Sequence, residues 1–377
     1  MTDLVLVLNA GSSSLKFQVV DPASGEVRVS DHLERVDESG GFEAALAAMQ
    51  ESVEAAGIGR DDLVAVGHRV VHGGDRLRDP TLVDDEVVAT IEHLVRLAPL
   101  HNPPALAGIR AALATYDDLP QVAVFDTGFF ADLPPAAATY AIDRDVAAAE
   151  GIRRYGAHGI SHGYVAGEVA RALDRDLDEL DQVVLHLGNG ASAAAISGGR
   201  PVDTSMGLTP LEGLVMGTRP GDIDAGVLLH LLRHGDLDVD GLEDLLHHRS
   251  GLEGLAGGHD VRDLVRRLGE GDPDVCLAWD VYCRRIRKYV GAYLAVLGGA
   301  DAVTFTAGVG ENVPVVRRDA LAGLEPLGVV LDPARNEACA GPDGPVVVSA
   351  DRSAVAVLVV PTNEELAIAR DVVALLG

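Results

Sequence analysis

Three short apolar runs, each followed at once by a glycine-rich turn, recur along the chain and constrain its fold more than any other feature. They are Val5–Leu8 before NAGSSSLK (9–16), Val183–Leu187 before GNGAS (188–192) and Val303–Thr306 before AGVGEN (307–312). The first two continue into second β-type runs, Phe17–Val20 and Ala193–Ile196, and therefore predict hairpins, whereas the third predicts a strand that leads into a helix. A unit repeated across both halves of a chain predicts two related α/β domains that face one cleft.

Length and helical periodicity support the same architecture. The chain has 377 residues, more than one hydrophobic core usually organises, so two domains are expected. The predicted helices are Phe42–Ala56, Asp84–Ala98, Pro104–Ala114, Gly163–Leu173, Ala225–His234, Asp260–Leu268, Val275–Leu297 and Glu364–Leu376. Strands that alternate with helices indicate α/β architecture, and the proline-rich loop at 132–135 is a candidate domain boundary.

The formal net charge of −28 excludes two classes of partner. A surface this negative repels nucleic acid and anionic membranes, so an anionic ligand needs a local site made of Arg, Lys or backbone N–H groups. The three cysteines include no CxxC pair, which argues against a disulfide framework or a zinc site, and no apolar window is long enough to span a bilayer. Since the sequence starts without a basic and apolar leader, we expect a soluble, cytoplasmic protein with no nucleic-acid or membrane partner.

The turn at residues 9–16 contains the parts of an anion-binding nest. Glycine lets the backbone approach a phosphate, while the serines and Lys16 add hydroxyl groups and an ammonium group. Lys16 is one of only two lysines in the chain, and we expect it on the buried side of the hairpin. The alternative is a plain hairpin turn with solvated serines. The turns at 188–190 and 308–310 are ambiguous when each is taken alone, but three such turns after apolar strands are hard to explain by packing.

Two arginines stand in unusual surroundings. Arg69 lies inside the β-type run GHRVVHGG (67–74), where a charge is costly unless it meets an anion. It therefore either pairs with a structural carboxylate or faces a substrate anion. Arg219 lies in the glycine-framed segment GTRPGD (217–222). Because a guanidinium group matches carboxylate and phosphate geometry with two parallel hydrogen bonds, both arginines are candidates for holding an anion.

Asp126 and Glu364 are candidate magnesium or positioning groups. Each is predicted to end an apolar strand, where side chains project into a cleft, and oxygen ligands suit a magnesium ion that arrives with a nucleotide. Glu364 has an alternative role as an acid that stabilises a helix N-terminus. His158, in the glycine-framed segment YGAHG, is placed to donate a hydrogen bond to a phosphoryl oxygen.

Together these segments resemble the acetate kinase family of carboxylate kinases, within the actin, sugar-kinase and Hsp70 ATPase superfamily. The matching motifs extend from residue 9 to residue 370: NAGSSSLKF, GHRVVHGG, PLHNPP, FDTGF, RRYGAHGISH, HLGNGAS, DTSMGLTPLEGLVMGTRPGDID, FTAGVGENV and PTNEELAIAR. The resemblance implies two duplicated ribonuclease H-like (actin-like ATPase) domains with a central cleft. Residues 1–128 plus 365–377 would form the first domain, and residues 129–364 would form the second, which binds nucleotide and dimerises.

The resemblance also implies an activity and a role for each matching residue. The activity is reversible phosphoryl transfer from ATP to acetate, which gives ADP and acetyl phosphate, with Mg²⁺ as the metal, Mn²⁺ as its substitute, and a homodimer as the assembly. Catalysis is assigned to Arg69, Asp126, His158 and Arg219, and acid binding to Arg69, Val71, Leu100 and Pro210. Nucleotide binding is assigned to Asn9, Ser12, Ser14, Lys16, His186, Gly188, Asn189, Gly190, Asp260, Arg262, Gly308, Gly310 and Asn312. The metal is assigned to Asn9 and Glu364.

The sequence departs from the family pattern at several positions. Ala157 stands where the family has a phenylalanine that helps to close the acyl pocket, which predicts acceptance of propionate or a larger acid. Asp75, Ile160 and Pro220 stand where the family has Glu, Thr and Ser. The rival interpretations are therefore a propionate or butyrate kinase, a variant that uses pyrophosphate, and a non-catalytic or filament-forming actin-like protein that binds nucleotide.

Overall fold

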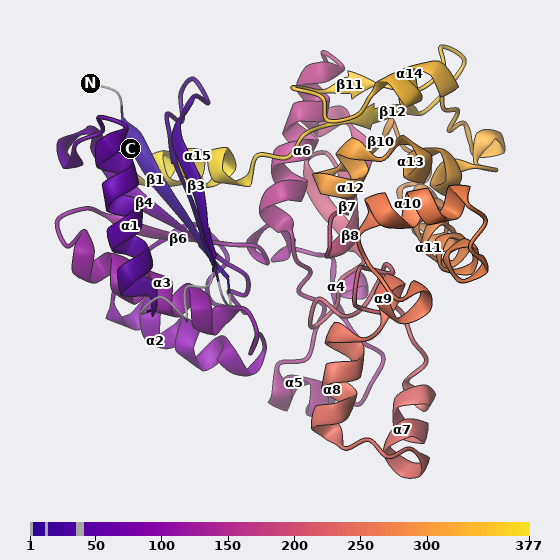
Figure 1. Ribbon diagram of the computed structural model, residues 1–377, viewed down its shortest axis with the longest axis horizontal. Coiled ribbons are helices and arrows are strands. Elements are labelled where there is room, and N and C mark those ends of the chain that lie inside the picture. Colours follow the sequence, from indigo (N-terminus) through magenta and orange to yellow (C-terminus); the bar gives the residue numbers. More distant parts are fainter. Residues whose placement is uncertain (1–2, 12–13, 35–40) are drawn as a thin grey trace. The chain divides into compact units, whose positions relative to one another are not determined.

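The computed structural model describes residues 3–11, 14–34 and 41–377 (Figure 1). The chain divides into two compact units. Unit 1 consists of Met1–Ala131, Ala157–Tyr164 and Asn363–Gly377, and unit 2 consists of Asp132–Gly156 and Val165–Thr362. The predicted domain division after residues 128 and 364 stays a prediction.

Unit 1 is built on a mixed six-stranded sheet in the order β3-β2-β1-β4-β6-β5. Its strands are β1 Leu4–Ala10, β2 Ser14–Val20, β3 Val27–Glu34, β4 Leu63–Val70, β5 Thr81–Leu82 and β6 Gln121–Phe125. β1, β2 and β3 form an antiparallel meander, while β4 runs parallel to both β1 and β6. The hairpin predicted around residues 9–16 is therefore confirmed as β1 and β2.

Helices cover both faces of this sheet. They are α1 Gly41–Ala55, α2 Asp85–His93, α3 Asn102–Thr115 and α15 Glu364–Leu376. Because successive side chains of a strand point to opposite faces, Leu4, Leu6 and Leu8 of β1 pack in one core cluster with α1, whereas Val5 and Val7 pack in another with α15. A strand that is buried on both faces must be apolar throughout, as the LVLVL of β1 is.

Unit 2 repeats the topology of unit 1 strand by strand. Its strands are β7 Asp181–Leu187, β8 Ala191–Ser197, β9 Arg200–Thr204, β10 Ala302–Thr306, β11 Val346–Val347 and β12 Ala356–Val359. They lie in the order β9-β8-β7-β10-β12-β11, with an antiparallel meander followed by parallel pairs, as in unit 1. The duplicated ribonuclease H-like fold predicted for this chain is therefore confirmed.

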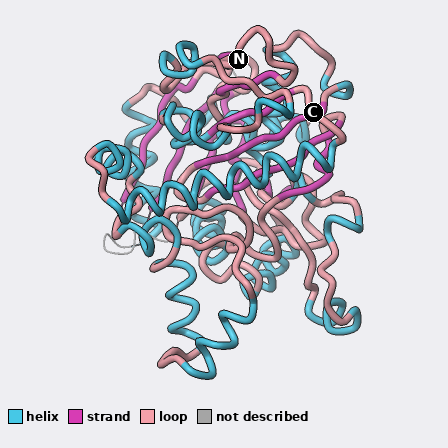
Figure 2. Tube along the Cα trace, turned by 90° about the vertical axis from the view of Figure 1, so that its right-hand side faces the viewer, coloured by secondary structure: helices cyan, strands magenta, loops and turns pink. Residues whose placement is uncertain are grey.

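The helices of unit 2 lie between and around these strands. They are α4 Pro135–Ala138, α5 Arg144–Glu150, α7 Ala225–His234, α8 Val239–His248, α9 Gly251–Ala256, α10 Val261–Gly269, α11 Pro273–Leu297, α12 Ala307–Asn312, α13 Pro314–Leu321 and α14 Pro333–Ala338. α6 Gly159–Ala172 begins in unit 1 and ends in unit 2. α11, the longest helix of the described chain, packs against β8 and β7 and crosses the strands in Figure 2.

Some helical predictions differ from the structure. The predicted helix Asp84–Ala98 is too long: Asp84 caps α2 by accepting a hydrogen bond from the Val87 N–H (2.8 Å), and the helix ends at His93 before a 3₁₀ turn. The helices that were not predicted are α4, α5, α8, α9, α13 and α14. Within the described ranges, no helix combines the length and the apolar character that a membrane crossing requires.

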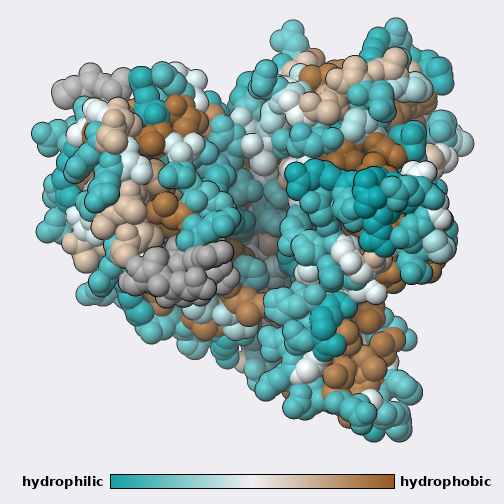
Figure 3. All heavy atoms as spheres, viewed as in Figure 1, coloured by the Kyte–Doolittle hydropathy of each residue, from teal (hydrophilic) through white to brown (hydrophobic). Residues whose placement is uncertain are grey.

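Helix α7 presents an unusually apolar surface. None of its residues is buried, and Val227, Leu229 and Leu232 are each at least 39% exposed, as is Ile223 just before the helix. Figure 3 shows brown, apolar atoms in the part of unit 2 where Figure 1 places α7. This helix contributes surface rather than core to unit 2.

Candidate functional site

The β1–β2 hairpin places two predicted site residues side by side. Asn9 of β1 is directly opposite Lys16 of β2, and the Gly11 N–H closes the turn by donating to the Ser14 carbonyl (2.8 Å). Lys16 is exposed rather than on the buried side, so that expectation was wrong; its ammonium group forms an ion pair with Glu365 (2.5 Å). Ser12 lies outside the described residues.

Arg69 is the centre of a charged cluster in unit 1. It is the penultimate residue of β4, and its guanidinium forms ion pairs with Asp126 (Nη2 to Oδ2, 2.6 Å) and Glu364 (Nε to Oε2, 3.2 Å). Its Nη1 also donates to Asn9 Oδ1 at 3.4 Å. Of the two interpretations of Arg69, the pairing with carboxylates is therefore present, and three other predicted site residues lie around the same guanidinium.

Burial sets the protonation of this cluster. Asp126 directly follows β6 and is 1% exposed. Burial raises the pKa of Asp126, and the nearby Glu364 carboxylate raises it further. Together these effects outweigh the attraction of Arg69, so the pKa of Asp126 is raised to about 6. Burial disfavours the charged form of Arg69 as well, but Asp126 and Glu364 together outweigh it and hold the pKa of Arg69 above its ordinary value. The arginine therefore stays charged.

Asn9 and Glu364 carry oxygen atoms of the kind that magnesium prefers. Glu364 is the first residue of α15, five residues after β12 ends, so the prediction that it ends a strand was wrong and its alternative position at a helix N-terminus is correct. The amide oxygen of Asn9 and the carboxylate of Glu364 both contact Arg69. In the part of the chain that the structure describes, no group of three or more His, Cys, Asp or Glu residues could hold a metal alone. Two hard oxygen donors suit an ion that takes its remaining ligands from phosphates and water.

His158 is joined to Asp126 by a backbone hydrogen bond of the next residue, Gly159. The Gly159 N–H donates to the Asp126 carbonyl (2.9 Å), and a Cβ atom on Gly159 would lie only 2.2 Å from that oxygen, so glycine is required there. His158 itself adopts a left-handed conformation (φ +61°), which costs a non-glycine residue on the order of 1–3 kcal/mol. Such strain often accompanies a functional position.

The residues predicted to bind the acid come from both units. Val71 follows β4 and is partly buried, whereas Leu100, in the turn before α3, is 41% exposed; both belong to unit 1. Pro210 belongs to unit 2, and its carbonyl accepts a hydrogen bond from Arg219 Nη1 (2.8 Å). The structure thus brings Pro210 together with Arg219.

Arg219 differs from Arg69 in having no carboxylate partner among the described residues of unit 2. It is partly buried, and burial lowers its pKa. The positive charge of Arg219 in turn contributes, after burial, to a lowered pKa of His247. A desolvated guanidinium with one carbonyl partner retains donors for an anion.

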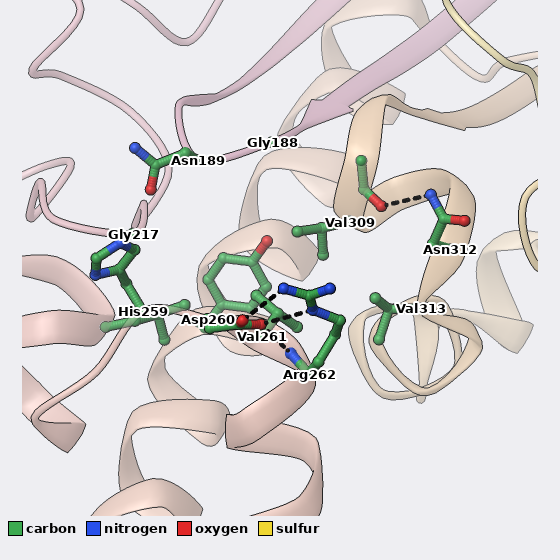
Figure 4. Close-up of a pocket in the computed structure, with 13 residues that line it drawn as sticks. Gly188, Asn189, Gly217, His259, Asp260, Val261, Arg262, Val309, Asn312 and Val313 are labelled. Carbon is green, nitrogen blue, oxygen red and sulfur yellow. Dashed lines mark hydrogen bonds and ion pairs between the residues drawn. The ribbon is translucent and has the colours of Figure 1, made fainter. Parts of the chain in front are cut away.

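A pocket of about 640 Å³ lies in unit 2 (Figure 4). Its lining residues are Gly188, Asn189, Gly217, Leu252, His259, Asp260, Val261, Arg262, Tyr282, Gly308, Val309, Asn312 and Val313. Six predicted nucleotide-binding residues therefore line one pocket. Gly190, Gly310 and His186 do not line it, although His186 is the buried penultimate residue of β7 and Gly310 belongs to α12 in the wall.

The polar side chains of this pocket are held by local hydrogen bonds. Asp260 caps α10 by accepting from the Arg262 N–H (2.9 Å), and Arg262 Nη2 donates back to Asp260 (2.7 Å). The hydrogen bond from the Arg262 side chain is the main cause that lowers the pKa of Asp260 to about 2. Asn312 donates to the Gly308 carbonyl (2.9 Å), as Figure 4 shows. Both hydrogen-bonded pairs are exposed, so a ligand can replace one partner of either hydrogen bond.

Sequence reasoning missed several residues that shape this pocket. Tyr282 of α11 and Leu252 of α9 line it, but both are buried hydrophobic residues of the kind that ordinary core packing uses. Arg317 is fully buried and donates to the Gly310 carbonyl (2.7 Å), which fixes the α12 wall. The segment PVVRRDAL (314–321) gave no signal that distinguishes Arg317 from its exposed neighbour Arg318.

Comparison with known proteins gives a consistent match over the whole chain. The model of the acetokinase family matches residues 4–59 and 31–370. The crystal structure of acetate kinase from Porphyromonas gingivalis is 37% identical, with a TM-score of 0.92 over 100% of both chains. A propionate kinase from Francisella tularensis subsp. tularensis SCHU S4 is 34% identical (TM-score 0.90, 98% of both chains). Acetate kinase from Entamoeba histolytica is 28% identical (TM-score 0.86, 97% of both chains).

Proposed function

The chain belongs to the acetokinase family, and we propose that it catalyses reversible, direct in-line phosphoryl transfer from ATP to acetate, giving ADP and acetyl phosphate. That it is a kinase, a phosphotransferase that acts on a carboxylate, follows from the family. A non-catalytic actin-like protein is therefore no longer a competing interpretation. The choice of acetate and the roles of individual residues are the proposal.

The observation that carries this proposal is that Arg219 has no carboxylate partner among the described residues of unit 2. A carboxylic acid with a pKa near about 4 to 5 is already ionised at neutral pH, so the nucleophile needs no general base. It needs neutralisation of charge, because an anionic carboxylate and an anionic phosphate repel each other. A partly buried guanidinium without a carboxylate partner in its own unit supplies that neutralisation, with Arg69 and His158 in the same role.

The unit 2 pocket supports the nucleotide half of the proposal. Its volume of about 640 Å³ lies within the range of about 300–1,000 Å³ typical of small-molecule sites. Asp260, Arg262, Gly308 and Asn312 would face the nucleoside, while Asn189 and the adjacent glycines would approach the phosphates. Asn9, Lys16 and Ser14 are proposed on the phosphate path.

Magnesium is proposed at Asn9 and Glu364, with manganese as a substitute. When bound, the ion would neutralise part of the phosphate charge. Arg69 contacts both of these oxygen donors, so it would keep them oriented. Its positive charge would also attract the acceptor anion. Asp126 in turn would hold the Arg69 guanidinium in place.

The direct test is acyl-phosphate formation from ATP, magnesium and a series of straight-chain acids, trapped as hydroxamate. We expect acetate to react and product to require both ATP and the metal. ATP hydrolysis without acyl phosphate, or no reaction with any acid, would reject the proposal. Replacing ATP by pyrophosphate in the same assay separates the pyrophosphate-using variant.

A longer acid is a second candidate substrate, and Ala157 favours it. Ala157 is 4% exposed and stands where the family has phenylalanine, and one of the similar structures is described as a propionate kinase. We expect propionate kcat/KM to approach that of acetate. Ala157→Phe should shift the preference towards acetate by roughly 10-fold, since one methylene is worth about 1–3 kcal/mol in an apolar pocket. A wild-type preference for acetate by orders of magnitude would contradict this candidate.

We further propose a cytoplasmic homodimer. The exposed apolar side chains of α7 support self-association, because a contiguous apolar surface is costly in water. Light scattering of the purified protein should give twice the mass of the chain, and Leu229→Glu should shift it to the monomer. A monomeric wild-type protein would reject this part of the proposal.

A further inference from the structure

The Asp222 carboxylate joins the two ends of the loop that carries Arg219, and we call the junction of Gly213 and Asp222 the loop neck. The Asp222 N–H donates to the Gly213 carbonyl (3.0 Å), and the Gly213 N–H donates to Asp222 Oδ1 (3.0 Å). We call residues 214–221, between these two, the Arg219 loop. Gly221 turns the chain back at φ +69°, and a Cβ atom there would lie 2.3 Å from the Leu214 carbonyl oxygen. The two ends of the loop are thus in close contact.

Helix α11 fixes the same neck to the body of unit 2. The Tyr289 hydroxyl donates to the Asp222 carboxylate, 3.0 Å from Oδ1 and 3.1 Å from Oδ2. Arg285 donates to the Gly213 carbonyl (2.7 Å) and the Asp222 carbonyl (3.1 Å), and its Nη1 lies 3.4 Å from Asp222 Oδ2. Because α11 packs on β7 and β8, these bonds tie the loop neck to the sheet.

The far end of the Arg219 loop reaches the nucleotide pocket. The Gly217 N–H donates to the Asn189 carbonyl (3.0 Å), and both residues line the pocket. The Met216 N–H donates to the Arg219 carbonyl (3.0 Å), which sets the backbone from which the Arg219 side chain extends. Among the residues that the structure describes, the guanidinium donates to the Pro210 carbonyl alone. Its direction therefore depends on the backbone of the loop.

We propose that Asp222 is a positioning residue that acts through Arg219. Its carboxylate is engaged by Gly213, Tyr289 and Arg285, so it aligns the loop rather than contacting a substrate. Reacting groups must be held in near-attack geometry, and a displacement of about 1 Å costs on the order of 10²-fold in rate. This inference rests on the proposed function, because Arg219 is taken to hold the reacting anion.

The test compares Asp222→Asn, Arg219→Ala and the double variant. Asparagine keeps the size but replaces one acceptor oxygen with a donor, so the neck cannot satisfy Gly213, Tyr289 and Arg285 together. We expect Asp222→Asn to lower kcat by about 10²-fold. We expect ADP affinity, measured by calorimetry, to change less than about threefold. The double variant should be no slower than Arg219→Ala alone, because the two changes remove the same interaction.

Asp272→Asn is the matched control. Asp272 caps α11 and, like Asp222, accepts from backbone N–H groups and from an arginine, Arg267 (2.9 Å), but it does not contact the Arg219 loop. Its kcat should equal that of the wild type. Tyr289→Phe, which removes one donor and leaves the carboxylate, should lower kcat by about 10-fold and serves if Asp222→Asn does not fold.

The outcomes separate this inference from the proposed function. Wild-type formation of acyl phosphate with an equally fast Asp222→Asn variant would reject only the role of Asp222. Effects of Asp222→Asn and Arg219→Ala that multiply in the double variant would show that Asp222 acts independently of Arg219. If Asp222→Asn does not fold, an unchanged kcat in Tyr289→Phe rejects the role. A wild-type protein that forms no acyl phosphate rejects both proposals together.

Discussion

Arg69 in unit 1 and Arg219 in unit 2 are both partly buried arginines, but the partners of their guanidinium groups differ. Arg69 is 18% exposed and paired with Asp126 and Glu364, which raise its pKa. Arg219 has the Pro210 carbonyl as its hydrogen-bond partner, and burial lowers its pKa. The first arginine is paired with two carboxylates, whereas the second carries an unpaired positive charge.

The difference predicts which arginine contributes to stability. Removing one member of a buried ion pair leaves the other charge without compensation, whereas removing an unpaired charge leaves no such charge behind. In a chain of net charge −28, an unpaired cation is also the stronger attractor of an anion. We therefore expect Arg69 to combine structural and catalytic roles and Arg219 to be mainly catalytic.

The largest effect is expected for Arg69→Ala. We expect kcat to fall by about 10²-fold or more because charge stabilisation is lost. The free energy of unfolding should also fall, by about 3–5 kcal/mol, since Asp126 is left buried without its partner. Urea unfolding and steady-state kinetics measure the two effects. Adding Asp126→Asn should restore stability but not activity, and an Arg69→Ala variant as stable as the wild type would remove the contrast between the arginines.

Arg219→Ala should match that loss of activity without the loss of stability. We expect kcat to fall by about 10²-fold. The free energy of unfolding should change by less than about 1 kcal/mol, because no carboxylate of unit 2 depends on this arginine. Arg219→Lys keeps the charge but not the planar fork and should recover only part of the rate. A stability loss as large as that of Arg69→Ala would show that Arg219 has a structural partner.

Glu364→Gln tests the metal assignment within the unit 1 cluster. We expect the magnesium concentration for half-maximal rate to rise by about 10-fold, because a charged oxygen ligand becomes neutral. Initial rates over a magnesium titration measure this. Glu86→Gln is the control, since Glu86 is also an acid in the first turn of a unit 1 helix. An unchanged titration in Glu364→Gln would withdraw Glu364 from the metal site.

Asp371 of α15 provides a partly buried carboxylate to compare with the fully buried Asp126. Burial raises the pKa of Asp371 to about 6 from 3.8. Between these pH values the native state binds more protons than the unfolded state, so the free energy of unfolding falls as the pH rises from about 4 to about 6. Asp371→Asn should therefore stabilise the protein at pH 7 by on the order of 2 kcal/mol and have little effect below pH 3.8. Equal effects at both pH values would contradict this explanation.

Much of the fold could be predicted because the informative patterns are local. The alternation of strand and glycine turn identified the β1–β2 and β7–β8 hairpins, and α7 and α15 have the predicted bounds. α2 ended early because the chain leaves α-helical geometry in a 3₁₀ turn at Leu94–Arg96, where no proline or glycine marks the end. Local patterns thus predict that an element exists better than they predict where it ends.

The candidate site was less predictable because its contacts join distant segments. Sequence could nominate Arg69 but could not choose between a carboxylate partner and a substrate. Asp126 reaches Arg69 through the pairing of β4 with β6, and Glu364 reaches it through the packing of α15 on β4. Lys16 looked like a buried cation, but the hairpin register places it on the exposed side beside Glu365. Asp222 carried no signal of its own, because its role depends on Tyr289 and Arg285 of a helix far along the chain.

The division of unit 1 across the chain determines when it can be completed during synthesis. One face of its sheet packs against Leu366, Ile368 and Val372, which belong to α15, a helix that leaves the ribosome after the whole of unit 2. Unit 2 is complete at Thr362, so its core can form while the first β-sheet still exposes Val5 and Val7 to solvent. A chain truncated after unit 2 would leave that apolar face uncovered. A premature stop codon between unit 2 and α15 would therefore yield an aggregation-prone protein, even though every residue of the unit 2 pocket had been made.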